Sequence, residues 1–182
     1  MSYLPINPSH IRRYKNYAIV ELRRKNKPSQ WAKISKEDIP LVENLSWFPA
    51  FTYGKTYAAR RHYVGNKRFT TLYLHRLIAS QMGEVRGKNI DFVNGDPFDC
   101  RRENLRILSR STHRALRNST NPTGYRGVTP AATEGKWVCK MLYNGKCFHT
   151  THDTVEEAAR QYDVLVQRYR KDFPKEYLNF PQ

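Results

Sequence analysis

Apolar and polar residues alternate over several short stretches in the first part of the chain, as they do in half-buried strands. Two such runs, residues 17–22 and 31–34, predict a short pair of strands. The β-rich runs 56–60 and 69–74 flank the turn-forming residues 65–66 and predict a hairpin. The beginning of the chain is therefore expected to be rich in β-structure.

Two short helices are predicted among these strands. Ser35 lies three residues before Asp38, which is the spacing of an N-terminal capping box, and an apolar stripe follows at Ile39 and Val42. A second helix is expected to begin at His75, directly after the hairpin.

The middle of the chain predicts the order strand, strand, helix. The run 89–93 and the run 105–108 are β-rich and are separated by the turn-forming residues 94–97. Ser109 is expected to cap a helix over residues 110–117. This is a ββα unit.

The last part of the chain predicts three strands followed by one amphipathic helix. The strands are expected over residues 124–128, 136–142 and 146–150, with a type I′ turn at Asn144-Gly145. Residues 154–157 form a capping box that begins the helix. Its apolar face is formed by Ala158, Tyr162, Leu165, Val166 and Tyr169.

Charge divides the chain unevenly. The 182 residues carry 32 Lys and Arg against 16 Asp and Glu, a formal net charge of +16. Residues 1–118 hold 23 basic and 9 acidic residues, net +14, whereas residues 119–182 hold 9 and 7, net +2. Turn formers crowd residues 117–124. We therefore predict an α+β fold with two domains, 1–118, with its ββα core at about 86–118, and 119–182.

Composition also excludes several classes of protein. No apolar run reaches the ~18 residues that a membrane span needs, and the first residues lack the order of a signal peptide. Three cysteines without a C-x-x-C motif argue against a disulfide framework or a four-cysteine zinc site. An intracellular protein of the cytoplasm or nucleoid, without a membrane partner, fits best. The net charge indicates a polyanionic partner, and nothing in the sequence specifies an oligomeric state.

One group of residues has candidate chemistry. Asp91, Asn104 and His113 lie on the two strands and the helix of the ββα unit, so a carboxylate and an imidazole could reach one metal ion. Such a ligand set suits Mg²⁺ or Mn²⁺ promoting phosphodiester cleavage. The structural alternative is that Asp91 caps the turn, Asn104 bonds to the backbone and His113 lies on a basic helix face.

Several segments resemble the HNH endonucleases of phages and homing introns. They are Leu74–Ile78 (LHRLI), Ile90–Asp96 (IDFVNGD) and Asp99–Ile107 (DCRRENLRI). The stretch around Trp47 and Tyr57–Arg60 is similar to the leader of that family. The resemblance implies metal-dependent cleavage of DNA and a phage- or intron-encoded origin.

The end of the chain, from residue 124 to 181, resembles the ethylene-response-factor (APETALA-type) DNA-binding domain. The matching residues are Tyr125–Val128, Trp137, Glu156–Ala159, Tyr162-Asp163 and Leu178–Phe180. The resemblance implies a second module in which a three-stranded sheet reads duplex DNA in the major groove.

The HNH resemblance also implies roles for single residues. It makes Asp91 and His113 the metal ligands and Asn104 the residue that supports the geometry of the site. The family has a general-base histidine directly after the aspartate, where this chain has Phe92. Cys100 stands where the family commonly has Asn.

A phenyl ring cannot accept a proton, and loss of a general base typically costs about 10²- to 10⁴-fold in rate. Cleavage could be slow, His75 could replace the base, or the nuclease could be inactive and act by binding. His75 also has a structural interpretation, because Leu74, Leu77 and Ile78 around it have the spacing of core residues.

Two sets of side chains are candidates for binding DNA. The arginines expected to bind backbone phosphates around the candidate metal site are Arg101, Arg102, Arg106, Arg110, Arg114 and Arg117. On the sheet of the second domain the candidates are Arg126, Lys136, Trp137, Lys140 and Lys146, although Trp137 could instead belong to the core.

These observations favour a DNA-binding HNH-type homing endonuclease that nicks duplex DNA with one Mg²⁺ or Mn²⁺ ion. Its activity is expected to be weakened or lost because Phe92 stands in place of the general-base histidine. The alternative is an inactive nuclease relative that binds DNA or RNA as a regulatory or structural component. RNA stays open as a partner because net charge does not distinguish polyanions.

Overall fold

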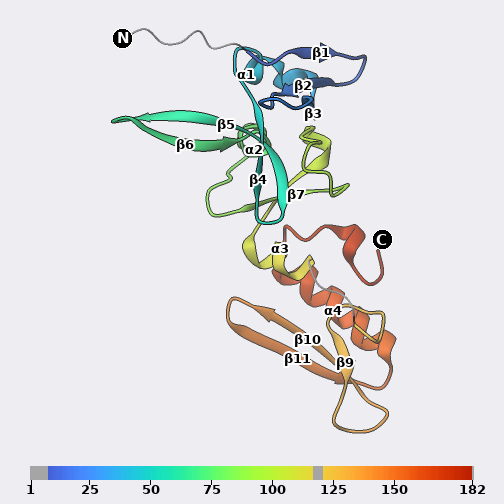
Figure 1. The fold of residues 1–182 in the computed structure, drawn as a ribbon. Coiled ribbons are helices and arrows are strands. Elements are labelled where there is room, and N and C mark those ends of the chain that lie inside the picture. The colour runs from blue at the N-terminus through green and yellow to red at the C-terminus, as the bar shows by residue number, and fades with distance from the viewer. Residues whose placement is uncertain (1–7, 117–120, 182) are drawn as a thin grey trace. The chain divides into compact units, whose positions relative to one another are not determined.

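The computed structural model describes residues 8–116 and 121–181. Contacts within the chain form two units, residues 1–107 and residues 108–182, which contain different elements (Figure 1). Each unit has its own apolar core. Secondary structure is mixed, with helices and several small sheets, which is compatible with the predicted α+β class.

The first sheet of the N-terminal unit contains β1 (Ile11–Arg13), β2 (Ala18–Leu22) and β3 (Gln30–Ile34) in antiparallel order. Alternate residues of β2 are buried, which confirms that the alternation in the sequence marks one core-facing side. The predicted strand pair is confirmed, and β1 is an additional edge strand too short to show a pattern.

A second antiparallel sheet contains β4 (Phe48–Thr52), β5 (Lys55–Gly65) and β6 (Arg68–Tyr73). The β5–β6 hairpin was predicted, but its turn lies one residue later, at Asn66 and Lys67, which both have positive φ. The β4 strand was not predicted, because Pro49 lies within it and its residues do not alternate in burial.

The helices of this unit are η1 (Lys36–Asp38), α1 (Ile39–Val42) and α2 (Leu74–Met82). Ser35 is the N-cap residue of η1, but the predicted capping box is wrong, because the Ser35 side chain makes no capping hydrogen bond. The Ser35 hydroxyl instead accepts a hydrogen bond from the backbone N–H of Arg102 at 2.9 Å, a partner 67 residues away.

Next along the chain come β7 (Asn89–Phe92), η2 (Arg102–Asn104) and β8 (Leu105–Leu108). Strands β7 and β8 form a two-stranded sheet, as predicted. The core of the unit gathers apolar side chains from both larger sheets and from α1 and α2, among them Val20, Leu22, Ile34, Val42, Trp47, Leu74 and Ile78.

The C-terminal unit has a sheet in the order β11 (Lys146–His152), β10 (Trp137–Tyr143), β9 (Val128–Pro130). The prediction of a strand over residues 124–128 is wrong for all but its last residue. Gly124 and Gly127 have φ of 76° and 69°, in the left-handed region that strands do not use, so β9 begins only at residue 128. The predicted turn at Asn144-Gly145 is confirmed.

Helix α4 (Val155–Tyr169) packs across this sheet, as Figure 1 shows. Its capping box is confirmed, since the Thr154 hydroxyl accepts from the Glu157 N–H and the Glu157 carboxylate accepts from the Thr154 N–H. The core beneath it contains buried residues of the predicted stripe and of the sheet: Val128, Cys139, Met141, Ala158, Tyr162 and Val166.

Helix α3 (Arg110–Leu116) is grouped with this C-terminal unit, although the predicted boundary lay after residue 118. The reason is a set of contacts with the segment after α4, which contains η3 (Lys175–Tyr177). The carboxylate of Asp172 accepts from the N–H of Ser109 and from the hydroxyl of Thr112 at 2.5 and 2.6 Å. None of the described helices has the length and hydropathy to span a membrane.

Candidate functional site

Asp91, the candidate metal ligand, lies in β7 and is ion-paired. Its Oδ2 accepts from Nη2 of Arg106 in β8 at 2.9 Å, and the two side chains are only 28% and 15% exposed. Its Oδ1 makes no hydrogen bond within residues 8–116 and 121–181. The carboxylate is therefore neutralised by a neighbouring guanidinium while one oxygen stays available to a further cation.

Asn104 holds the loop that connects β7 to β8. Its Nδ2 donates to the carbonyl oxygen of Asp99 at 2.7 Å and to Oδ1 of Asn94 at 3.0 Å, and its Oδ1 accepts from the Asn94 N–H at 2.9 Å. Its own carbonyl accepts from the Val93 N–H. These bonds fix the loop directly after Asp91, a positioning role.

Asp99 is the second anchor of the same loop, and the sequence did not mark it as a site residue. Arg101 binds both of its oxygens, at 2.8 and 2.7 Å, and Asn94 donates to it at 3.0 Å. Burial would raise the pKa of Asp99, but these hydrogen bonds lower it below its usual value. Asp99 is thus a structural carboxylate that is held charged.

Phe92 belongs to a cluster of aromatic rings. Its ring centroid lies 5.3 Å from that of His75, in an edge-to-face arrangement, and 6.2 Å from that of Tyr57. His75 also contacts Tyr57 and Tyr73, at 5.2 and 5.7 Å. Phe92 and His75 therefore lie together, within an apolar environment.

This environment sets the protonation of His75. The residue is only 9% exposed, and burial, with a smaller contribution from the Arg76 charge, lowers its pKa to about 4. Its Nδ1 is buried and has no hydrogen-bond partner among the described residues. At neutral pH the imidazole is uncharged, and its low pKa makes it a weak base.

His113 lies on α3, which belongs to the C-terminal unit, whereas Asp91 and Asn104 belong to the N-terminal unit. The side chain of His113 is half-buried. Within residues 8–116 and 121–181, no three or more His, Cys, Asp or Glu side chains gather as a metal-binding group. The oxygen of Asp91 and the imidazole of His113 are donor types that Mg²⁺ and Mn²⁺ accept, so these two residues fit such an ion in their chemistry.

Three of the predicted phosphate-binding arginines are engaged in ion pairs. Arg101 pairs with Asp99 and Glu103, and Arg106 pairs with Asp91. Arg102 donates to the fully buried carboxylate of Asp38 at 2.6 Å, which raises the pKa of this arginine. Arg102 and Arg106 therefore each join two segments of the N-terminal unit, whereas Arg101 stabilises its own loop.

The remaining arginines of the set differ from these. Arg110 and Arg114 are exposed on α3, whereas Arg117 lies outside the described residues.

The candidates on the second domain also divide into two groups. Lys140 and Lys146 are exposed on the sheet, and Lys136 is ion-paired with Asp153. Trp137 is half-buried against the core of the C-terminal unit, and Arg126 donates to the carbonyl oxygens of Ala115 and Leu116 at the end of α3.

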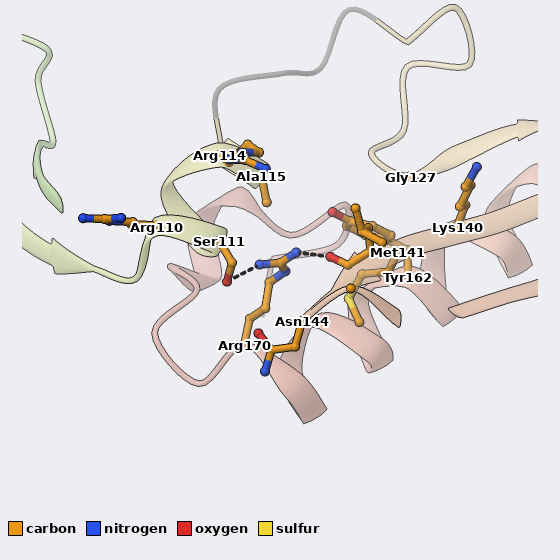
Figure 2. A pocket seen from close by; sticks show the side chains of 12 residues that line it. Arg110, Ser111, Arg114, Ala115, Gly127, Lys140, Met141, Asn144, Tyr162 and Arg170 are labelled. Carbon is orange, nitrogen blue, oxygen red and sulfur yellow. Dashed lines mark hydrogen bonds between the residues drawn. The ribbon is translucent and has the colours of Figure 1, made fainter. Parts of the chain in front are cut away.

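The C-terminal unit also contains a cavity of about 480 Å³, which Figure 2 shows from close by. Arg110, Arg114 and Lys140 line it, together with Arg170, which follows α4 directly. The sequence did not mark Arg170 as a site residue. Its position after the apolar face of α4 could have indicated that it is near the core, but nothing in the sequence predicts its partners.

Comparison with known proteins bears on one part of the chain. No curated protein and no solved structure matches it significantly. Residues 72–115, about a quarter of the chain, match a family model described as HNH endonuclease. This segment runs from the end of β6 to α3 and contains His75, Asp91, Phe92, Asn104 and His113. The match supports an HNH nuclease domain over residues 72–115, with nucleic acid, most readily DNA, as its substrate.

Proposed function

We propose that this protein is a DNA endonuclease of the HNH homing kind that nicks duplex DNA with one divalent metal ion. The observation that carries the proposal is the HNH family match, whose limits enclose Asp91, Asn104 and His113. The C-terminal unit, a three-stranded sheet packed on one helix, acts in this proposal as an APETALA-type DNA-binding module.

Asp91 and His113 would hold the metal, which we take to be Mg²⁺ or Mn²⁺. When bound, such an ion polarises a phosphodiester and stabilises the leaving oxygen. Asn104 keeps the loop after Asp91 in place through its bonds to Asn94 and Asp99. One metal site implies one strand cut in each encounter with DNA.

Cleavage is expected to be slow, because Phe92 offers no base. His75 is adjacent to Phe92 and uncharged at neutral pH, but its low pKa and its burial limit it as a replacement.

The second candidate function is nucleic-acid binding without cleavage. Two contacts favour it: the ion pair between Asp91 and Arg106, and the packing of Phe92 against His75 in an apolar cluster. Both arrangements stabilise the fold without a metal ion, as expected of a nuclease fold that only binds nucleic acid. Its partner in this second candidate function is duplex DNA or RNA.

Nicking of supercoiled plasmid by the full chain, with Mg²⁺ or Mn²⁺, separates the two candidates. Asp91→Ala and His113→Ala remove the proposed ligands, Phe92→His restores a base, and Asp153→Ala is the matched control, since its carboxylate is exposed and ion-paired with Lys136. The endonuclease proposal expects slow metal-dependent nicking by the unchanged chain and by Asp153→Ala, and none by Asp91→Ala or His113→Ala.

The other outcomes are equally informative. Nicking only by Phe92→His would favour the binding function on a scaffold that has lost its base. No nicking by any folded variant, judged by circular dichroism, would remove the support for both Asp91 and His113 as metal ligands.

A further inference from the structure

The far end of the β5–β6 hairpin is a two-stranded ribbon. β4 pairs with β5 only as far as Ala59, so beyond this residue β5 pairs with β6 alone. We call residues 60–72 the ribbon, and Figure 1 shows its tip extending away from the other elements of the N-terminal unit. Residues 61–64 and 66–71 are all exposed, so no described residue covers either face of this part of the ribbon.

Two aromatic rings lie on one face of the ribbon. Tyr63 and Phe69 are paired across the strands, their ring centroids are 5.3 Å apart, and the residues are 47% and 60% exposed. Directly opposite residues of antiparallel strands share a face, so both rings form one surface. Because rings this exposed add little to a core, the pair is suited to contact a partner.

The ribbon is also positively charged. Arg61 and Arg68 are exposed, and their guanidinium groups make no ion pair or hydrogen bond with any residue in 8–116 or 121–181. The sequence contains no Asp or Glu between residues 44 and 83. Such a surface is complementary to a polyanion and repels a cationic partner, a second copy of this chain included.

The aromatic face of the ribbon continues to the candidate site. Tyr57 and Tyr63 are six residues apart on β5, so both lie on the same face of the sheet. The ring of Tyr57 contacts those of His75 and Phe92, at 5.2 and 6.2 Å between centroids. A ligand that lies along this face is therefore led towards β7, the strand of Asp91.

We propose that the ribbon lies in the major groove of duplex DNA, with Tyr63 and Phe69 against base edges and Arg61 and Arg68 on backbone phosphates. The major groove admits a two-stranded β-ribbon, and apolar side chains there contact the thymine methyl group. A strand rises about 3.3 Å per residue, so the ribbon spans about 20 Å, or roughly six base pairs. This inference rests on the DNA binding of the proposed function and does not depend on cleavage.

Photocrosslinking with the full chain tests the contact directly. The probe is a duplex in which 5-iododeoxyuridine replaces thymidine, so the reactive atom stands in the major groove in place of the methyl group. We expect crosslinked peptides from residues 60–72, identified by mass spectrometry. The variant Y63T/F69T is expected to lose them, and its threonines preserve the β-propensity of both strands. Absence of any crosslink to residues 60–72 in the unchanged chain would overturn the proposal.

Fluorescence anisotropy with a labelled duplex measures what the rings contribute. We expect Y63T/F69T to weaken duplex binding about tenfold, without changing its dependence on salt. The matched control is F51T, which removes a ring that is 76% exposed on the same sheet. Phe51 is paired with Thr56, so it lies on the face opposite to Tyr63. Equal losses of affinity in Y63T/F69T and F51T would contradict a specific contact by the ribbon.

The same titrations over a range of salt measure what the arginines contribute. We expect R61Q/R68Q to lower the slope of log affinity against log salt by up to about two. The matched control, K25Q/K27Q, removes two exposed charges between β2 and β3 of the same unit. Equal slopes in R61Q/R68Q and K25Q/K27Q would show that the ribbon arginines do not bind phosphates.

Other occupants of the aromatic face are recognised in the same samples. A dimer that light scattering detects in the unchanged chain and not in Y63T/F69T would assign the face to a second copy and overturn the proposal. Tighter binding of a single strand than of the duplex, lost in Y63T/F69T, would overturn it as well.

Failure of this proposal is distinguishable from failure of the endonuclease proposal. Asp91→Ala is expected to bind duplex DNA and to crosslink through the ribbon as the unchanged chain does. Nicking without a crosslink to residues 60–72 would overturn the ribbon proposal alone, and a crosslink without nicking would overturn the endonuclease proposal alone.

Discussion

At the scale of single residues, Phe92, directly after Asp91, places an apolar ring beside the candidate site. Its neighbours are the rings of Tyr57 and His75. An imidazole in such surroundings is desolvated, which disfavours its charged form. The cluster therefore favours packing over proton transfer and couples the protonation of His75 to the stability of the fold.

We predict that His75→Phe flattens the pH dependence of stability. The pKa of His75 is about 4 in the fold and about 6.5 when unfolded, so the unfolded chain binds more protons between these values. The contribution of the neutral His75 ring to the free energy of unfolding is therefore fully present above pH 6.5. This contribution decreases as the pH falls towards 4, by roughly 3 kcal/mol at most.

Urea unfolding at pH 7.5 and at pH 4.5 measures this difference. His75→Phe should lose less stability than the unchanged chain between the two conditions, and His149→Phe, at an exposed position on β11, is the control. An equal loss in all three proteins would contradict the burial of an uncharged His75.

At the scale of elements, Gly127, directly before β9, lies close against Tyr162 of α4. An added Cβ there would lie 2.1 Å from Cδ2 of Tyr162 and 2.9 Å from the Lys140 carbonyl oxygen. The Gly127 carbonyl accepts from the Lys140 N–H at 2.7 Å, so the backbone cannot move away without losing a hydrogen bond. A glycine is required where the chain enters β9.

We expect Gly127→Ala to destabilise the C-terminal unit by at least about 2 kcal/mol, from overpacking against Tyr162 and from a φ of 69°. Urea unfolding followed by tryptophan fluorescence measures this, since Trp137 lies in β10. Gly135→Ala is the matched control, because its φ is 74° but nothing lies within 4 Å of the added atom. Similar losses in both variants would mean that contact with Tyr162 is unimportant.

At the scale of the whole molecule, the net charge of +16 suits the nucleic-acid binding that we propose. Part of this charge is already neutralised internally, since Arg101, Arg102 and Arg106 are ion-paired. Among the candidate DNA-binding residues, Arg110, Arg114, Lys140 and Lys146 are exposed and available for the proposed contacts with phosphates. Affinity is therefore expected to depend on many weak contacts in both units.

We predict that duplex DNA affinity falls about 10³- to 10⁵-fold between 50 and 200 mM salt, as expected for six to ten phosphate contacts. Anisotropy titrations with a labelled duplex measure it, and competition by structured RNA at matched salt tests the preference for DNA. A fall of less than tenfold would contradict binding driven by backbone phosphates.

Local signals in the sequence were sufficient for several elements. The Asn144-Gly145 turn and the Thr154 capping box depend on neighbouring residues, and both are confirmed. Ser35 had a similar local signal, but its hydroxyl bonds to Arg102, which no local pattern includes. The strand predicted over residues 124–128 failed because Gly124 and Gly127 have left-handed φ, and at Gly127 the chain also lies close against Tyr162 of the distant helix α4.

The candidate site also combines features that the sequence determines with features that only the fold decides. The sequence by itself determined the two-module order, the basic charge and the position of Asp91, Phe92, Asn104 and His113, because motifs and charge are properties of residue order. Which cations are paired, and which stay available to a ligand, was decided only by the tertiary structure. The reason is physical: whether a charge is buried, and what lies within hydrogen-bond distance of it, depends on segments far apart in the chain, as Arg102 with Asp38 and Arg170 with Ser111 illustrate.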